Sequence, residues 1–190
     1  LGVADPWSQL TVHPDCLVST EYHALMNRLR ESARGDARHG SCGLGIGETR
    51  HYWLRFGQDA VFARDLQDRG VLLAKLALLR DRFLLEMRGL SRCDDGLSAA
   101  IHDWLPTGEA NVLRHAAEPM ELSSDMPIAD AVIFERSQGV LLDEWYGFHP
   151  YTTWSTVTAQ HAKEMLADVP AAETTVLGIT RAYATRHGAG

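Results

Sequence analysis

The sequence predicts an α/β fold, in which a helical insertion is followed by part of a mainly parallel sheet core. Two observations carry this prediction. Apolar residues recur at helical spacing through the first half of the chain, whereas segments 131–134 and 174–184 are rich in the β-branched and aromatic residues of buried strands. The change of pattern after Pro127 predicts a helical subdomain, 1–127, with a glycine-rich loop over 36–57, and a segment of the α/β core, 128–190.

The first predicted helix follows Ser19 and Thr20, which can cap a helix, and ends at Gly35. Its apolar face is formed by residues at helical spacing: Tyr22, Leu25, Met26, Leu29 and Ala33. This pattern is typical of an amphipathic helix.

Two further helices are expected before the division. Val71 to Met87 forms a more apolar helix that Gly89 closes, and Leu97 to Leu105 forms another that Pro106 ends. Beyond the division, a polar stretch, 158–166, is expected to be helical and to separate the two predicted strands.

Composition narrows the class of protein. The 190 residues are 45% hydrophobic, which suits one globular unit, and the net charge of -7 argues against a nucleic-acid partner. The longest apolar stretch, 71–79, is broken by Lys75 and is far shorter than the roughly 20 residues of a membrane span. Three cysteines without CxxC spacing indicate neither a disulfide framework nor a zinc site. We expect a cytoplasmic protein without a metal site of its own in this chain.

A glycine-rich segment, 40–47, has the composition of an anion-binding nest. Glycines allow successive backbone N–H groups to converge on a phosphate, and Ser41 adds a hydroxyl. The Lys-Ser/Thr ending of a P-loop is missing, and a flexible turn between helices would have the same composition. Both interpretations stay open on the local sequence.

A second motif follows the apolar run 131–134. Here Glu135-Arg136-Ser137-Gln138-Gly139 and the residues up to Asp143 combine an acid, a turn and a Gln-Gly pair. At the carboxyl edge of a sheet, such a motif presents amide and backbone donors where open α/β folds bind nucleotides. The motif predicts a nucleotide site.

Several segments, in order and at similar spacing, resemble the adenylosuccinate synthetase family. The run from Tyr22-His23 through Arg30-Glu31 and Ala33-Arg34-Gly35 to 43–47 resembles the approach to the family's Thr-Thr-Gly-Arg-Gly-Ile-Gly signature, and Arg64-Asp65-Leu66 resembles its Gly-Asp-Leu. Residues 135–143 resemble its Glu-Gly-Ala-Gln-Gly-x-Leu-Leu-Asp, and 178–190, with Thr-Arg-His-Gly-Ala-Gly, its strand and turn near the ribose.

The resemblance implies part of a P-loop-like synthetase that joins IMP and L-aspartate. In that family GTP phosphorylates the 6-oxygen of IMP and the amine of aspartate then displaces the phosphate, with Mg²⁺ assisting; ATP could replace GTP in a divergent member. The family's catalytic Asp and His and its phosphate loop lie upstream of this segment. The chain is therefore expected to hold no catalytic residue and to be inactive alone.

The resemblance also implies the residues that bind IMP. Ser41 and Cys42 stand at the family's two threonines beside the phosphate, and Arg55 matches an arginine that reaches across a homodimer into the neighbouring site. Gln138 would hold the nucleotide and Thr153, fifteen residues later, its phosphate. The sixth candidate, with a weaker claim, is His187 beside Arg186.

Each assignment has a simpler alternative. Cys42 could be a small buried apolar residue, Arg55 a solvated helix arginine with Arg50 taking its role, and Gln138 and Thr153 polar turn residues. His187 could be a surface histidine.

The chain departs from the family at Glu48, Arg50 and Trp53, which replace Pro-x-Tyr-x-x-Lys, and at Arg136-Ser137, which replaces Gly-Ala. Another purine monophosphate such as dGMP, or a non-catalytic nucleotide-binding relative, therefore remains an alternative. A third is a helical interaction module that packs the apolar segment 71–90 on a partner.

Overall fold

The computed structural model describes residues 2, 4–90, 109–126, 130–167, 169, 173–180 and 182–183. The helix predicted over 97–105 and the candidate His187 lie outside these residues. By contacts the chain divides into two compact units, Leu1–Pro127 and Ile128–Gly188, and each is described by itself.

Helix α1, Glu21–Arg34, forms where the sequence predicts it. Thr20 precedes it in an extended conformation, and its backbone N–H donates to Nδ1 of His23 (3.0 Å), so a histidine supplies the reciprocal bond of a capping box. The helix ends at Gly35, whose φ of +56° lies in the left-handed region that glycine adopts without strain.

Helix α2, Ile46–Phe56, was not among the predicted helices. Its N-cap is Gly45, with φ +81°, and a Cβ there would lie 2.4 Å from the backbone nitrogen of Ala24. Glycine is therefore required where the start of α2 packs against the first turn of α1. The Thr49 hydroxyl lies 2.8 Å from that of Ser19, which further ties the two helix starts together.

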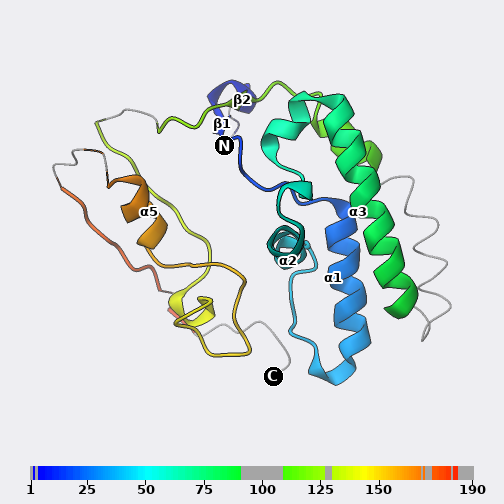
Figure 1. Ribbon diagram of the computed structural model, residues 1–190. Coiled ribbons are helices and arrows are strands. Elements are labelled where there is room, and N and C mark those ends of the chain that lie inside the picture. Colours follow the sequence, from blue (N-terminus) through cyan, green and yellow to red (C-terminus); the bar gives the residue numbers. More distant parts are fainter. Residues whose placement is uncertain are drawn as a thin grey trace. The chain divides into compact units, whose positions relative to one another are not determined.

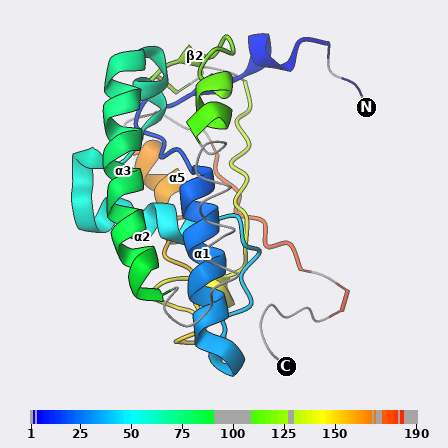
Figure 2. The same ribbon diagram turned by 90° about the vertical axis from the view of Figure 1, so that its right-hand side faces the viewer.

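Helix α3, Arg69–Leu90, is longer than predicted and continues through Gly89, which does not close it. Its buried residues recur every three or four positions and form one stripe: Leu72, Leu76, Leu79, Phe83 and Met87. Figures 1 and 2 show α1, α2 and α3 packed side by side in the first unit.

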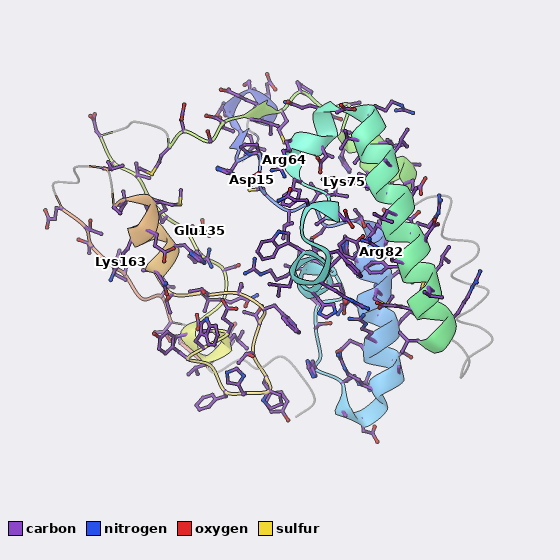
Figure 3. All side chains as sticks on the ribbon, viewed as in Figure 1. Asp15, Arg64, Lys75, Arg82, Glu135 and Lys163 are labelled. Atoms are coloured by element: carbon purple, nitrogen blue, oxygen red, sulfur yellow. The ribbon has the colours of Figure 1, made fainter. Side chains whose placement is uncertain are left out.

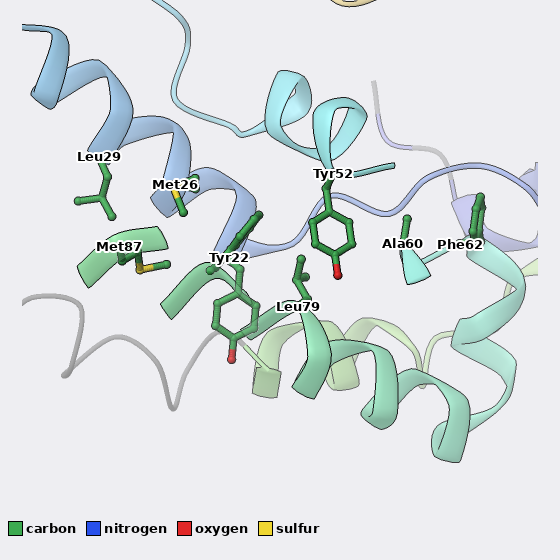
Figure 4. Close-up of a cluster of buried hydrophobic side chains, with 9 residues drawn as sticks. Tyr22, Met26, Leu29, Tyr52, Ala60, Phe62, Leu79 and Met87 are labelled. Atoms are coloured by element: carbon green, nitrogen blue, oxygen red, sulfur yellow. The ribbon is translucent and has the colours of Figure 1, made fainter. Parts of the chain in front are cut away.

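The core of this unit lies among the three helices. Tyr22, Met26 and Leu29 from α1 meet Tyr52 from α2 and the α3 stripe, with Ala60 and Phe62 at one end (Figure 4). A second cluster joins Leu72 and Leu76 to Val61 and to Val112, in a helical segment over 109–115. Area burial of this kind supplies most of the stability of a small helical unit.

Short elements complete the first unit. These are the 3₁₀ turns η1 (Pro6–Gln9), η2 (Gly35–Ala37), η3 (Gly57–Asp59) and η4 (Ala63–Gln67) and the strands β1 (Thr11–Val12) and β2 (Glu121–Leu122). The two strands pair in parallel, Thr11 opposite Glu121, and form the one sheet found among the described residues. The Lys75 ammonium anchors η4 to α3 by pairing with buried Asp65 (2.6 Å).

The second unit contains the 3₁₀ turn η6 (Val140–Leu142) and helix α5 (Gln160–Met165), which confirms the helix predicted over 158–166. The strand prediction is wrong for 131–134 and for the described part of 174–184, which run without strand pairing; residues 181 and 184 lie outside the described residues. Ile133 and Ile179 are 91% and 98% exposed. A strand forms by pairing with a neighbouring strand, and the described residues place no strand beside either segment. The described structure is thus mostly helical, with a sheet far smaller than predicted.

Within the described part of the chain, every helix falls short of the length and apolar character that a membrane crossing requires.

We predict that Leu79→Ala lowers the free energy of unfolding by about 2 to 5 kcal/mol, because it removes a fully packed side chain and leaves a cavity. Leu85→Ala is the matched control, since Leu85 is 73% exposed on the same helix whereas Leu79 is 1% exposed. Urea denaturation followed by circular dichroism measures both. Equal losses for the two variants would contradict the three-helix core.

Candidate functional site

The glycine-rich segment forms an ordered loop between α1 and α2. The carboxylate of Glu31, near the end of α1, accepts hydrogen bonds from the backbone N–H groups of His39 (3.2 Å), Gly40 (2.7 Å) and Ser41 (3.2 Å). Arg34 donates to the same carboxylate at 2.6 Å. The loop therefore converges backbone donors on an anion, as the composition predicts, and that anion is one of the chain's own side chains.

Ser41 and Cys42, the two candidates for phosphate contact in this loop, are both exposed. The Ser41 hydroxyl donates to Oδ1 of Asn27 (2.9 Å), whereas Cys42 is a free cysteine. Because Cys42 is exposed, the alternative that it is a small buried apolar residue is wrong. Both side chains stand where a ligand could reach them.

Arg55 lies in the last turn of α2, and its side chain is 56% exposed. Its guanidinium donates to Glu86 Oε1 (2.8 Å) and lies 4.9 Å from the centre of the Phe56 ring. Glu86 also binds Arg30 (2.6 Å), which in turn binds Glu48 (2.7 Å). This ion-pair network crosses α1, α2 and α3 and presents Arg55 at the surface.

Arg50, the rival to Arg55, is placed differently. Its guanidinium lies over the Trp53 ring at 4.4 Å, and its Nε is buried without a hydrogen-bond partner. Arg50 and Trp53 line a cavity of about 370 Å³, together with Asp15, Leu17, Gln58 and Phe62. Figure 3 shows Asp15 beside Arg64, its ion-pair partner, at this edge of the first unit.

The residues that depart from the family pattern have clear structural roles. Glu48 is buried in the first turn of α2; burial raises its pKa, and the nearby Arg30 opposes that rise. Trp53 supports Arg50 by stacking. In the second unit the Arg136 guanidinium donates to the backbone carbonyl of Thr156, so this side chain supports a loop.

Gln138 and Thr153 belong to one folded loop of the second unit. Gln138 has φ +77°, a conformation that non-glycine residues rarely adopt, and its side chain is exposed. The backbone N–H of Thr153 donates to the carbonyl of Leu142 (2.7 Å), which holds Thr153 against the turn that follows Gln138. The structure thus brings these two predicted residues into the same loop, and the alternative of simple turn residues stays open.

Asp143 holds this loop together, and its part was not predicted. It is fully buried, and its carboxylate accepts the backbone N–H groups of Trp145 (2.8 Å), Tyr146 (3.1 Å) and Val157 (2.7 Å). Burial alone would raise the pKa of this carboxyl, but these bonds and one from Thr158 hold the pKa below its ordinary value. The sequence signal that could have indicated this role is the position of Asp143, which follows an apolar pair and precedes an aromatic turn.

No group of three or more metal-binding side chains occurs among the described residues. The described loops carry hydroxyl, amide, guanidinium and backbone N–H groups. Such donors suit the recognition of a phosphate and a purine ring.

The whole chain, residues 1–190, matches the family model described as Adenylosuccinate synthetase. It is 32% identical to the adenylosuccinate synthetase of Acidithiobacillus ferrooxidans over 190 residues, 99% of this chain, and 32% identical to that of Bdellovibrio bacteriovorus over 187 residues. The enzyme of a Parafrankia strain is 29% identical over 184 residues. The chain spans 42–44% of the length of these relatives.

We predict that the loop closed by Asp143 loosens in acid. The folded-state pKa of Asp143 lies below the unfolded value of about 3.9, so its contribution to stability is complete above that value and is lost as the pH falls through the folded-state pKa. Hydrogen exchange of the Val157 amide measures the opening. Asp143→Asn should expose this amide at neutral pH, whereas Asp130→Asn, at an exposed carboxylate of the same unit, should not.

An unchanged Val157 exchange rate in Asp143→Asn would show that the carboxylate does not hold the loop.

Proposed function

Because this chain belongs to the adenylosuccinate synthetase family, we propose that it forms the IMP-binding half of the active site of a synthetase that joins IMP to L-aspartate. In the proposed reaction the γ-phosphoryl group of GTP is transferred to the 6-oxygen of IMP. The amine of aspartate then attacks C6, phosphate leaves with the oxygen, and adenylosuccinate forms. Phosphorylation is needed because the oxo group is a poor leaving group.

We assign to this chain the binding of the nucleotide. Ser41 and Cys42 would contact its phosphate, Gln138 its nucleoside part and Thr153 its phosphate. His187, outside the described residues, is the remaining candidate. The phosphoryl donor, Mg²⁺, the catalytic Asp and His and the aspartate site would be supplied by other parts of a full-length synthetase, so the 190-residue chain by itself should not ligate.

The observation that carries this proposal is the backbone of Gln138. A non-glycine residue at φ +77° is strained by about 1 to 2 kcal/mol, and strain of this kind persists chiefly where a side chain is needed at that point. Gly139 follows directly and could have taken the turn position without strain. The positive φ of Gln138 therefore supports the proposal that its side chain serves the site.

One alternative rests on a specific observation. Arg50 and Trp53 form a stacked pair at the edge of a cavity, where the family has other side chains. A changed surface at this point would suit a different purine monophosphate, such as dGMP. Titration with IMP and dGMP in parallel decides between the two nucleotides.

We predict that Gln138→Ala in the intact protein weakens IMP binding by about ten- to a hundredfold, because a hydrogen bond to the nucleotide worth roughly 1 to 3 kcal/mol is lost. Gln138→Gly should show the same loss of affinity with equal or higher thermal stability, since glycine relieves the strain at φ +77°. Calorimetry and thermal melts measure the two quantities. Unaltered affinity in both variants would reduce Gln138 to a turn residue.

We further propose that the synthetase is a two-fold dimer in which Arg55 completes the partner's nucleotide site. Its exposed guanidinium suits bidentate contact with a phosphate, and a two-fold dimer is the commonest assembly. To reach the partner's site, Arg55 must leave the carboxylate of Glu86, which also binds Arg30.

Mixing two variants that are each impaired at an IMP concentration below saturation tests this arrangement. Arg55→Leu and Gln138→Ala subunits form mixed dimers with one intact site and one doubly damaged site. Half of the dimers are mixed after random exchange, so activity should return to about a quarter of wild type. Arg50→Leu replaces Arg55→Leu in a parallel mixture as the matched control. Rescue confined to the Arg50 mixture would transfer the role to Arg50, and mixed dimers without rescue in either would refute sharing.

A further inference from the structure

The loop that follows α1 is built around a carboxylate. Glu31 is 87% shielded, with a side-chain exposure of 13%, and its two oxygens take the N–H groups of His39, Gly40 and Ser41. Burial opposes the charge on Glu31, but the bond from Arg34 and those three backbone bonds lower its pKa. The carboxylate is therefore present as an anion in the folded chain.

The same donors would hold a phosphate. Successive N–H groups directed at one point form a nest, and the left-handed φ of +71° at Gly40 provides the required backbone turn. Positive charge flanks the nest on two sides: Arg34 binds Glu31, and Arg28 lies against Gly43, where a Cβ would be 3.5 Å from its Nε. Carboxylate and phosphate oxygens both accept such donors.

We propose that Glu31 is a built-in occupant of an anion site and that the phosphate of a nucleotide binds this loop by displacing it. The inference rests on the proposed function for the identity of the nucleotide, but it does not need that function for the anion site itself. Displacement releases the backbone donors of residues 39–41 and leaves Arg34 free to pair with the incoming phosphate.

The structure gives a reason for displacement rather than simple addition. The N–H of Ser41 is held by Glu31 and its hydroxyl by Asn27, so both donors of this residue are already satisfied inside the chain. A phosphate that binds Ser41 must therefore replace Glu31 at the N–H group or Asn27 at the hydroxyl. A dianionic phosphate gains more from Arg34 than a single carboxylate does, which favours the exchange.

An internal occupant lowers the apparent affinity for an outside anion to the intrinsic affinity multiplied by the fraction of time that the site is free. Removing it should therefore strengthen binding. If Glu31 served merely to shape the loop, its removal would disorder the donors and weaken binding. The two interpretations predict changes of opposite sign.

The test titrates inorganic phosphate into the 190-residue chain and follows the amide resonances of Gly40 and Ser41. Glu31→Ala should bind phosphate at least about tenfold more tightly than the unaltered chain, with the largest shifts at these two amides. Asp36→Ala is the matched control, because it removes an exposed carboxylate of the same loop without emptying the nest. It should leave the affinity within about twofold, the size of a remote surface charge effect.

Phosphate affinity that stays equal or falls in Glu31→Ala would overturn the proposal. Glu31→Gln guards against loss of fold: it keeps one carbonyl acceptor for the loop but removes the charge, and should bind phosphate with intermediate affinity. IMP and inosine form the second arm. Tighter phosphate binding without preference for IMP over inosine would support the Glu31 exchange and refute the purine-nucleotide function. IMP binding that Glu31→Gln leaves unchanged would support the purine-nucleotide function and refute the Glu31 exchange.

Discussion

The burial of one stripe of α3 against α1 and α2 is the interaction on which the first unit depends. Tyr22, Tyr52 and Phe83 meet at this junction, where Tyr52 and Phe83 pack edge to face with ring centres 5.7 Å apart. His23 lies between them, 2% exposed, and burial lowers its pKa to about 3, so it stays neutral and adds no charge to the core. The stripe packs against Leu29 near the end of α1 and Tyr52 in α2, the two helices that flank the glycine-rich loop.

Charged groups surround this core, and one of them, Glu31, binds the backbone N–H groups of the glycine-rich loop. The Arg30, Glu48, Glu86 and Arg55 network spans the three helices, and its outermost member is the arginine proposed to reach another subunit. Glu31 stands one position beyond Arg30 on α1 and turns to the loop instead. Adjacent residues of one helix thus serve two different purposes, because successive side chains point to different faces. Helix packing and anion binding share the same short segment.

The second unit is organised by a buried carboxylate more than by an apolar core. Asp143 gathers three backbone N–H groups, and the chain from Gln138 to Val157 folds around it. Several large side chains here face solvent, including Trp145, Tyr146, Phe148 and Ile179. These side chains are exposed in a chain that spans less than half the length of its relatives.

The sequence by itself determined the amphipathic helix after Thr20, its end at Gly35, the apolar α3 and the family, because helical periodicity, glycine stops and ordered motifs are local or linear signals. It also offered a nest as one interpretation of the glycine-rich segment and Gln138 as a candidate that stays a prediction. Tertiary structure decided the rest. The start of α2 is placed by Gly45, which packs on the backbone of α1, and the described parts of the segments predicted as strands have no neighbouring strand with which to pair. The nest is filled by Glu31 because a helix places that carboxylate within reach of a loop eight to ten residues later. Such contacts depend on distance in space, which no local pattern in the sequence records.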